Sequence, residues 1–330
     1  MEKKTVKLID IIVPAYNEEE SLPLFYEAIK AVESGLPGYG FRYIFVDDGS
    51  IDGSLEIMKD MAAKDPEVKY ISFSRNFGKE AAIYAGLRNS SGDMVVLIDA
   101  DLQHPTQLIP DMINAVENEG YGAAGAKRKA GFFSRSFTAL NNSISKTKLE
   151  KGATDFMCMS RAFVDAVLQL SETRRFTKGL FAWVGFKIKW LDFVQSKRAA
   201  GKSKWTFKKL FSYATDGLTA FSTIPLRLVT IVGALVFILA VIYIIITLIQ
   251  TIIWGIDVPG YVTTLVVLLF MGGVIMLAIG ILGEYISSIY METKNRPIYI
   301  MEQTNIGKTV SNEDKQICTG RTEPAREEDK

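Results

Sequence analysis

The stretch VVLIDADLQHP, residues 95–105, places two acidic residues directly behind an apolar run. The run has the character of a buried strand, and Asp99 and Asp101 follow it one residue apart. Residues i and i+2 of a strand point to the same side, so these two carboxylates would share one face. Their repulsion costs free energy unless a cation lies between them. The pattern therefore predicts a cation at this strand end, and Gln103 continues the same spacing.

Strand and helix signals alternate over the first 120 residues. We expect strands at 8–16, 41–50, 68–74 and 93–101, and helices at 18–34, 54–65, 79–90 and 105–120. This alternation predicts an α/β fold with a mostly parallel sheet, in which ligands bind beyond the carboxyl ends of the strands. The polar clusters PAYNE (14–18), VDDGS (46–50) and IDADLQ (98–103) follow three of these strands, so we expect them at one edge.

The acidic cluster has the composition of a divalent metal site. Two carboxylates and an amide oxygen are hard ligands that suit Mg²⁺ or Mn²⁺ better than zinc. Mg²⁺ held by one or two carboxylates usually completes its shell with substrate phosphates and water. Asp99, Asp101 and Gln103 therefore predict a metal that carries a phosphorylated substrate. Two solvated turn acids are the alternative for an isolated match of this kind.

A basic cluster supports a phosphorylated ligand. The segment SKRAAGKSKW, residues 196–205, contains four cations and no acid, and residues 127–129 add three more cations. Arg198 and Lys204 suit phosphate groups, because arginine and lysine form charge-assisted hydrogen bonds with them. A basic rim attracted to anionic lipid headgroups is the alternative, and both readings can hold at once.

Composition and spacing exclude several other functions. A net charge of +1 over 330 residues argues against a nucleic-acid partner. Cys158 and Cys318 are too far apart for a disulfide framework or a zinc site. The only histidine, His104, precedes Pro105, and we expect an exposed turn residue there. The G-x-G-x-x-G spacing at 120–125 follows an expected helix and no strand, so it is not a dinucleotide fingerprint.

The second half contains two long runs without a charged residue, 228–256 and 258–283. Each exceeds the roughly 20 apolar residues that cross a bilayer, so we predict two transmembrane helices at about 228–254 and 260–285. Cations flank the pair and the connecting loop has none, which predicts both termini in the cytoplasm. The cations are Lys202, Lys204, Lys208, Lys209 and Arg227 before the pair, and Lys294 and Arg296 after it. The apolar and basic stretch 205–221 suits an interfacial helix.

Taken together, the motifs resemble a known family. IIVPAYNE, VDDGS, FSRNFGKE, DADLQHP, DFMCMSR and RAAGKSKW are similar to motifs of the polyprenyl-phosphate glycosyltransferases, which include the bactoprenol glucosyltransferases and dolichol-phosphate mannose synthases of glycosyltransferase family 2. Residues 272–300 resemble the second span of the bacterial members, and the resemblance covers about residues 8–300. It implies a GT-A nucleotide-sugar-binding (Rossmann-like) domain followed by a two-helix transmembrane hairpin.

The resemblance also implies roles for individual residues. It implies nucleotide-sugar contacts at Pro14, Tyr16, Glu18, Val46, Asp48, Asp99, Ala100, Arg128, Arg198 and Lys204. It implies metal ligands at Asp99, Asp101 and Gln103, with Mg²⁺ or Mn²⁺ as cofactor, and catalytic roles for Asp155, Asp101 and Arg198. Where the family commonly has GDFRLMSR, this chain has TDFMCMSR, which keeps Asp155 and loses an arginine.

Asp155 occupies the place of the carboxylate usually described as the catalytic base. The implied acceptor is a phosphate monoester, whose second pKa is about 6, so it is already largely dianionic in the cytosol. We therefore interpret Asp155 as a residue that orients the acceptor or the sugar.

The implied reaction is the inverting, metal-dependent transfer of a hexose from UDP-glucose or UDP-N-acetylglucosamine to undecaprenyl phosphate, for cell-envelope glycosylation. The implied partners are the nucleotide sugar, the lipid acceptor, the bilayer, a second copy of the chain, and a downstream flippase and envelope glycosyltransferase. A catalytically inactive membrane adaptor that binds nucleotide sugar is one alternative. A processive polysaccharide synthase is another, but the chain lacks its Q-x-x-R-W motif and additional spans.

The expected organisation has four parts. They are a cytoplasmic glycosyltransferase domain (1–200), a basic interfacial segment (201–226), the two transmembrane helices (227–287) and a partly disordered cytoplasmic tail (288–330). The protein is thus expected in the cell membrane as a two-pass protein.

Overall fold

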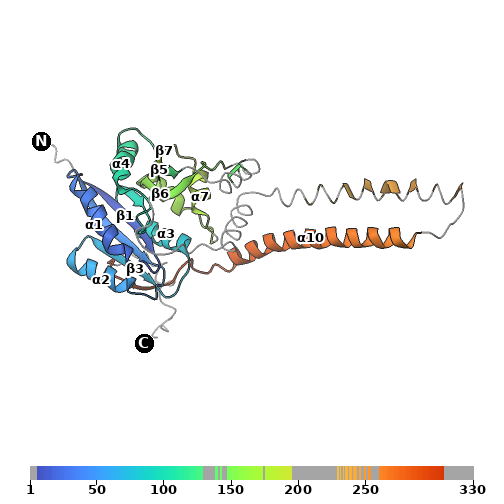
Figure 1. The fold of residues 1–330 in the computed structure, drawn as a ribbon, viewed down its shortest axis with the longest axis horizontal. Helices are drawn as coiled ribbons and strands as arrows, with labels where there is room; N and C mark the ends of the chain where they lie inside the picture. The colour runs from blue at the N-terminus through green and yellow to red at the C-terminus, as the bar shows by residue number, and fades with distance from the viewer. Residues whose placement is uncertain are drawn as a thin grey trace, which may run out of the picture.

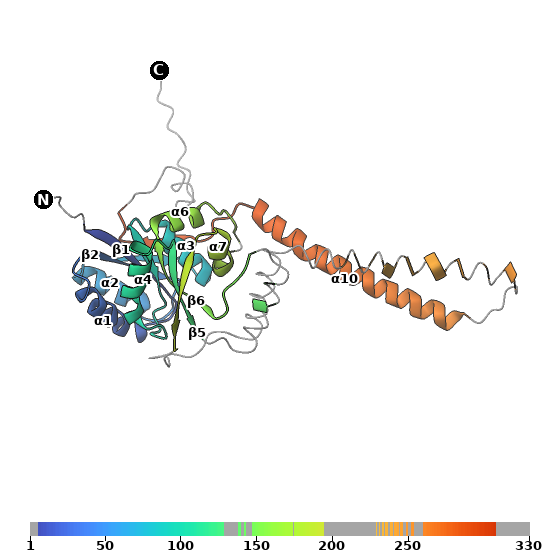
Figure 2. The same ribbon diagram turned by 90° about the horizontal axis from the view of Figure 1, so that it is seen from above.

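The structure is a computed structural model, and it describes a defined part of the chain. The described residues are 6–128, 138–139, 142, 147–173, 175–194, scattered residues between 229 and 253, and 260–307. They form an α/β domain and a long helix, α10 (Tyr261–Thr293), that extends away from it (Figures 1 and 2).

The domain is built on an eight-stranded sheet with the order β7-β5-β6-β4-β1-β2-β3-β8. Its central strands are β1 (Lys7–Ala15), β2 (Tyr39–Asp47), β3 (Val68–Phe73) and β4 (Met94–Leu97), which pair in parallel. The strands β6 (Ala153–Ser160) and β8 (Met301–Thr304) join this parallel core in antiparallel direction. The predicted α/β class is confirmed, and the sheet is mixed.

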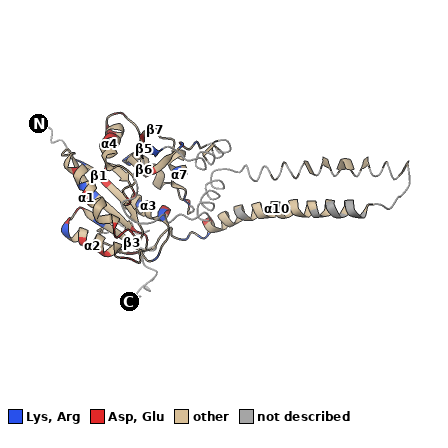
Figure 3. Cartoon of the chain, viewed as in Figure 1, with Lys and Arg blue, Asp and Glu red and all other residues tan. Residues whose placement is uncertain are grey.

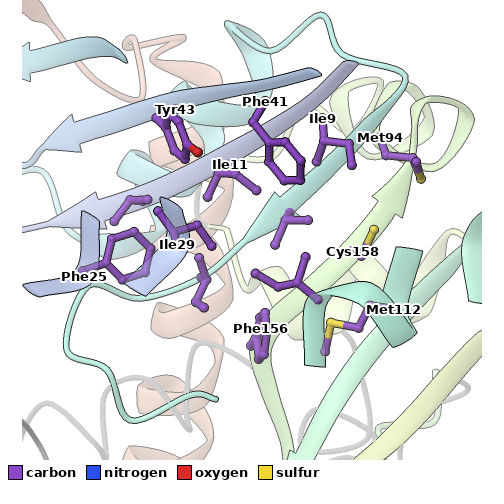
Figure 4. Close-up of a cluster of buried hydrophobic side chains, with 14 of the residues drawn as sticks. Ile9, Ile11, Phe25, Ile29, Phe41, Tyr43, Met94, Met112, Phe156 and Cys158 are labelled. Carbon is purple, nitrogen blue, oxygen red and sulfur yellow. The ribbon is translucent and has the colours of Figure 1, made fainter. Parts of the chain in front are cut away.

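Helices cover both faces of the sheet. Along β1, Ile9 and Ile11 face one core and Ile12 faces the other, as strand alternation requires. The first core lies against α1 (Ser21–Ser34), α2 (Ser54–Lys64) and α4 (Ile109–Glu117), and Figure 4 shows part of it. The second lies against α3 (Lys79–Arg88), α6 (Arg161–Leu168) and α7 (Thr177–Trp183). Every element expected over the first 120 residues is present, with a short 3₁₀ turn, η1 (Thr106–Leu108), before α4.

The strand behind the acidic pair ends earlier than expected. β4 stops at Leu97, where its ladder with Met157 of β6 ends, so Asp99 and Asp101 lie in the following turn and not on the strand. Leu102 has a φ of 56°, which bends the chain away from the sheet. The expectation of a shared strand face was therefore wrong, because the chain turns as soon as it leaves its ladder.

Two of the three glycines in the spacing at 120–125 lie in or directly before the strand β5 (Ala123–Arg128). It pairs with β6 and with β7 (Ile188–Phe193). A Cβ atom on Gly122 or Gly125 would lie 2.5 Å from the ring of Phe186 or Trp190, respectively. These glycines allow two aromatic rings to pack on the strand, which agrees with the rejection of a dinucleotide site.

The helix α10 is, within the described ranges, the one helix long and apolar enough to cross a membrane, over Phe270–Thr293. Its only charged residues are Glu284 and Glu292, whereas charges are frequent on the domain (Figure 3). Large apolar side chains such as Leu268 and Met276 are more than half exposed along it. The expected first span, 228–254, lies largely outside the described residues, although every described residue between 229 and 253 is helical.

After α10 the chain returns to the domain. The strand β8 adds to the edge strand β3, and the Tyr299 ring stacks on Phe73 with centroids 4.8 Å apart. The Asn305 side chain accepts a hydrogen bond from the Tyr70 amide and donates one to the Val68 carbonyl. The segment expected to be a tail thus contains a strand of the sheet, and residues 308–330 lie outside the described part.

Candidate active site

The three polar clusters lie at one end of the sheet. Ala15 of β1 pairs with Asp47 of β2, and Ile12 of β1 pairs with Leu97 of β4, so the loops after these strands are neighbours. The Asn17 amide, at a φ of 53°, donates to Ser50 Oγ at 2.9 Å and ties the first two loops together. Parallel strands therefore bring these clusters to one edge, as the sequence predicts.

The expected nucleotide contacts differ in exposure. Pro14 and Val46 lie within β1 and β2 and are buried, and Ala100 is buried in the turn after β4. Tyr16 and Glu18 are half-buried in the loop after β1. The residues with side chains accessible to a ligand at this edge are thus the loop residues and not those inside the strands.

Asp48 organises the loop that leads into α3. Its carboxylate accepts hydrogen bonds from the backbone amides of Phe77, at 2.7 Å, and Gly78, at 3.0 Å. Burial raises the pKa of Asp48 to about 6, although the two amides favour its ionised form. Gly49 next to it has a φ of 67°, and a Cβ there would lie 2.4 Å from the Arg75 backbone, so the close approach requires glycine.

A lysine joins two of the acids at this edge. Lys79, the first residue of α3, has its Nζ 2.7 Å from Asp99 and 2.7 Å from Asp155. Burial would lower the pKa of Lys79, but Asp155 and Asp99 outweigh it and hold this pKa above its usual value. Burial would likewise raise the pKa of Asp155, but Lys79 and then Lys178 hold it well below its usual range. The cation beside Asp99 is thus a lysine shared with Asp155, whereas the sequence predicts a metal ion between Asp99 and Asp101, which stays a prediction.

Asp101 and Gln103 form the turn that follows. The Asp101 carboxylate accepts a hydrogen bond from the Gln103 amide at 3.1 Å, which closes an Asx turn, and both residues are half-buried. Among the described residues, no three His, Cys, Asp or Glu side chains gather in a way that could hold a metal alone. Asp99 and Asp101 fit an ion that takes its remaining oxygens from a substrate and water, as Mg²⁺ commonly does.

His104 is buried, so the expectation of an exposed turn residue was wrong. It is 9% exposed and packs between Phe156 and Phe193, with ring centroids 5.5 and 5.6 Å away. Its Nδ1 makes no hydrogen bond within the described residues, and burial lowers its pKa, so its ring is neutral at pH 7. The turn after Leu102 directs this ring under β6 and β7, where two aromatic side chains cover it.

Two further charged residues complete the cluster. Lys178 lies 3.8 Å from Asp155, and Glu80 accepts hydrogen bonds from the amide and hydroxyl of Thr177 at the start of α7. Lys79, Glu80 and Lys178 were not identified from the sequence. The available signal for Lys79 is the sequence GKE five residues after the end of β3, because Gly78, at a φ of 102°, directly precedes a helix that starts at the carboxyl edge of the sheet.

Of the three remaining candidate residues, the structure describes Arg128 but neither Arg198 nor Lys204. Arg128 is exposed at the end of β5, where its amide donates to the Gly152 carbonyl. Arg198 and Lys204 lie outside the described residues, as does the whole interfacial segment 201–226.

Comparison with known proteins identifies the family. Residues 10–166 match the family Glycosyl transferase family 2, and residues 224–289 match the GtrB C-terminal hairpin. The Bacillus subtilis protein with the name "Putative glycosyltransferase CsbB" is 45% identical, covering 91% of this chain and 92% of that protein. The SfII prophage-derived bactoprenol glucosyl transferase of Shigella flexneri is 40% identical, covering 91% of this chain and 99% of that protein.

Among solved structures, the glucosyl-3-phosphoglycerate synthase of Mycobacterium tuberculosis, in complex with Mn²⁺ and UDP-glucose, is 21% identical. The match covers 64% of this chain and 77% of that chain, with a TM-score of 0.44. A likeness of that degree says nothing about the ligands of this chain. The family assignment rests on the relatives that are 40–45% identical and that cover 91% of this chain. The chain therefore belongs to glycosyl transferase family 2, is a glycosyltransferase, and carries a GtrB C-terminal hairpin.

Proposed function

We propose that the protein transfers glucose from UDP-glucose to a polyprenyl phosphate, undecaprenyl phosphate in a bacterial membrane, with inversion at the anomeric carbon. The proposal rests on one arrangement in a family 2 domain. The carboxylates of Asp99 and Asp155 both contact the Lys79 ammonium, at the edge of the sheet where ligands bind. The names of relatives such as the Shigella flexneri bactoprenol glucosyl transferase support glucose over N-acetylglucosamine and a polyprenyl acceptor.

In this reaction an oxygen of the acceptor phosphate attacks the anomeric carbon, and the bond from that carbon to the nucleoside diphosphate breaks. The acceptor is already largely dianionic at neutral pH, so no group has to remove a proton from it. Asp155 stays ionised beside Lys79 and Lys178 and would orient the sugar or the acceptor. Arg198 and Lys204 would bind the phosphates.

Asp99 and Asp101, with Gln103 near them, would hold Mg²⁺ or Mn²⁺ against the donor diphosphate. The ion would neutralise the charge that develops on the departing diphosphate. The donor set supports this proposal because it consists only of hard oxygen ligands.

The apolar helix α10 and the GtrB hairpin support a site at the membrane surface. We propose two spans with both termini in the cytoplasm, where nucleotide sugars are available. The lipid-linked sugar would then pass to a flippase and an envelope glycosyltransferase. Self-association and these downstream partners are proposals based on the resemblance.

The test is a transfer assay with purified full-length protein, radiolabelled UDP-glucose and undecaprenyl phosphate in detergent. Labelled lipid should form with Mg²⁺ or Mn²⁺, should not form in EDTA, and should form poorly from UDP-N-acetylglucosamine. Asp101→Asn should reduce turnover by about 100-fold or more, because it removes an anionic ligand of the ion. Asp60→Asn, on the exposed face of α2, should leave turnover unchanged. No labelled lipid from either donor would contradict the proposal, and full activity in EDTA would contradict the metal.

A further inference from the structure

The two acids that contact Lys79 lie at the ends of neighbouring strands. β4 and β6 pair antiparallel, with Leu97 opposite Met157. Asp155 lies on β6 two residues from Met157, and Asp99 lies two residues beyond the end of β4. One ammonium group contacts both carboxylates, so the two negative charges lie close together, and their repulsion costs free energy unless a cation lies between them. The chain therefore needs a cation at this point before any ligand arrives.

Lys79 meets this need from a fixed position. The amide of Gly78, the residue before it, donates to the buried carboxylate of Asp48. The chain is thus anchored directly before Lys79, and α3 continues behind it. From this helix start the Nζ reaches both oxygens of Asp99, at 2.7 and 2.9 Å, and one oxygen of Asp155, at 2.7 Å.

The other charged residues nearby do not share this arrangement. Lys178 lies 3.8 Å from Asp155 and donates to the Ala153 carbonyl, and no contact with Asp99 is found for it. Glu80 directs its carboxylate to Thr177. Among the described residues, Lys79 is therefore the cation that contacts both acids. One is Asp99, an expected metal ligand, and the other is Asp155, which is expected to orient the acceptor or the sugar.

We propose that Lys79 is a positioning residue that competes with the divalent ion for Asp99 and holds Asp155 in place once that ion is bound. This inference rests on the proposed function. An ammonium group carries three donors, so it can neutralise both acids while the donor site is empty. A doubly charged ion at Asp99 repels the ammonium and leaves it to Asp155. Lys79 would thus keep the site folded without a ligand and orient Asp155 with one.

The test measures Mn²⁺ binding by isothermal titration calorimetry, on full-length protein saturated with UDP, so that no turnover is required. Lys79→Met should bind Mn²⁺ roughly ten-fold more tightly, because a competing charge beside Asp99 is removed. Lys79→Arg keeps the charge and should bind it like the wild type. Lys59→Met is the matched control, because Lys59 pairs only with Glu56 on α2 among the described contacts.

Steady-state kinetics supply the second readout. Lys79→Met should lower kcat by about ten-fold or more while the donor KM stays within about three-fold, because Asp155 loses its orientation and the donor keeps its metal. Lys79→Arg should recover part of kcat. A raised donor KM with unchanged kcat would instead make Lys79 a donor-phosphate ligand and would overturn the proposal, as would weaker or unchanged Mn²⁺ binding in Lys79→Met.

A third variant keeps the test decisive if Lys79→Met does not fold. In Asp155→Asn the ammonium has only Asp99 left, so Mn²⁺ affinity should fall. In the Lys79→Arg background, Asp155→Asn should lower the Mn²⁺ affinity by a similar factor. In the Lys79→Met background, where this protein folds, Asp155→Asn should leave the Mn²⁺ affinity unchanged. Unchanged Mn²⁺ binding in Asp155→Asn would contradict the competition. If the variants show these shifts in Mn²⁺ affinity but the wild type transfers no sugar, the proposed function fails and this inference stands. If the wild type transfers sugar but the variants show no such shifts, this inference alone fails.

Discussion

At the scale of single residues, Asp48 links protonation to folding. Its side chain is 4% exposed and accepts amide hydrogen bonds from the loop before α3. Burial raises its pKa from 3.8 to about 6, so the folded protein holds this proton more tightly than the unfolded chain does. The resulting stabilisation is complete below about pH 4 and is lost as the pH rises through about 6.

We therefore expect Asp48→Asn to change the pH dependence of stability. Between pH 4 and pH 7 the wild type should lose free energy of unfolding relative to the variant, by about 3 kcal/mol for a shift of this size. Urea unfolding of the detergent-solubilised protein, followed by tryptophan fluorescence, measures this difference. Asp60→Asn should show the pH dependence of the wild type, because Asp60 is exposed. A constant difference between wild type and Asp48→Asn at all pH values would contradict the raised pKa.

Single residues also show which parts of the candidate site could be predicted from the sequence. The spacing of Asp99 and Asp101 predicts a cation between these two acids, and that cation stays a prediction, whereas the structure shows one that joins Asp99 to Asp155. The spacing could not reveal this second cation, because Lys79 comes from a helix that begins 20 residues upstream of Asp99. Asp155 was found by resemblance, but its partner was not. His104 was misjudged because the two rings that bury it come from distant strands.

At the scale of elements, β8 protects an edge of the sheet. It occupies the open side of β3, where unpaired backbone groups would otherwise remain, and Tyr299 covers Phe73. Asn305 extends the pairing with two side-chain hydrogen bonds to the β3 backbone. The last part of the described chain is thus part of the catalytic domain.

Truncation should reveal this role. A chain that ends after Lys294 loses β8, the stacked ring and the bonds of Asn305. We expect it to be less stable by about 2–4 kcal/mol, from lost apolar burial and one aromatic pair. A chain that ends after Gly307 keeps every one of these contacts and should unfold like the full-length protein. Thermal unfolding in detergent distinguishes the two, and equal midpoints for both truncations would mean that β8 does not stabilise the domain.

Elements were predictable where their pattern is local. The first eight follow from alternating and helical apolar spacing and from helix starts such as Pro105. The strand β5 was missed because its first four residues are alanine and glycine, which carry little strand propensity. The strand β8 has four residues, three of them exposed, and exists because β3 offers an edge.

At the scale of the whole molecule, the pairing of β3 with β8 constrains the topology. β3 precedes all apolar runs and β8 follows them, yet the two strands are hydrogen-bonded. Both must therefore lie on the same side of any membrane that the chain crosses. The number of crossings between them must then be even. If α10 is one crossing, a second must lie between residues 195 and 260, where the apolar run 228–256 is long enough to provide it.

Cysteine labelling of intact bacterial cells tests this topology. Cys318 is replaced by serine, and Cys158 can stay, because burial raises the pKa of its thiol to about 12 and leaves almost no reactive thiolate. Single cysteines are then placed at the exposed positions Asp60, Gly260 and Gly307.

A maleimide that cannot cross the membrane should label Gly260→Cys on intact cells, and should label Asp60→Cys and Gly307→Cys only after permeabilisation. The charge asymmetry decides which side is which, because the loop between the runs carries Asp257 and no cation, whereas Lys294 and Arg296 follow α10. Labelling of Asp60→Cys and Gly307→Cys from opposite sides would contradict the β3–β8 pairing. If the maleimide labels Gly260→Cys only after permeabilisation, as it does Asp60→Cys and Gly307→Cys, then α10 does not cross the membrane and the hairpin lies on the membrane surface.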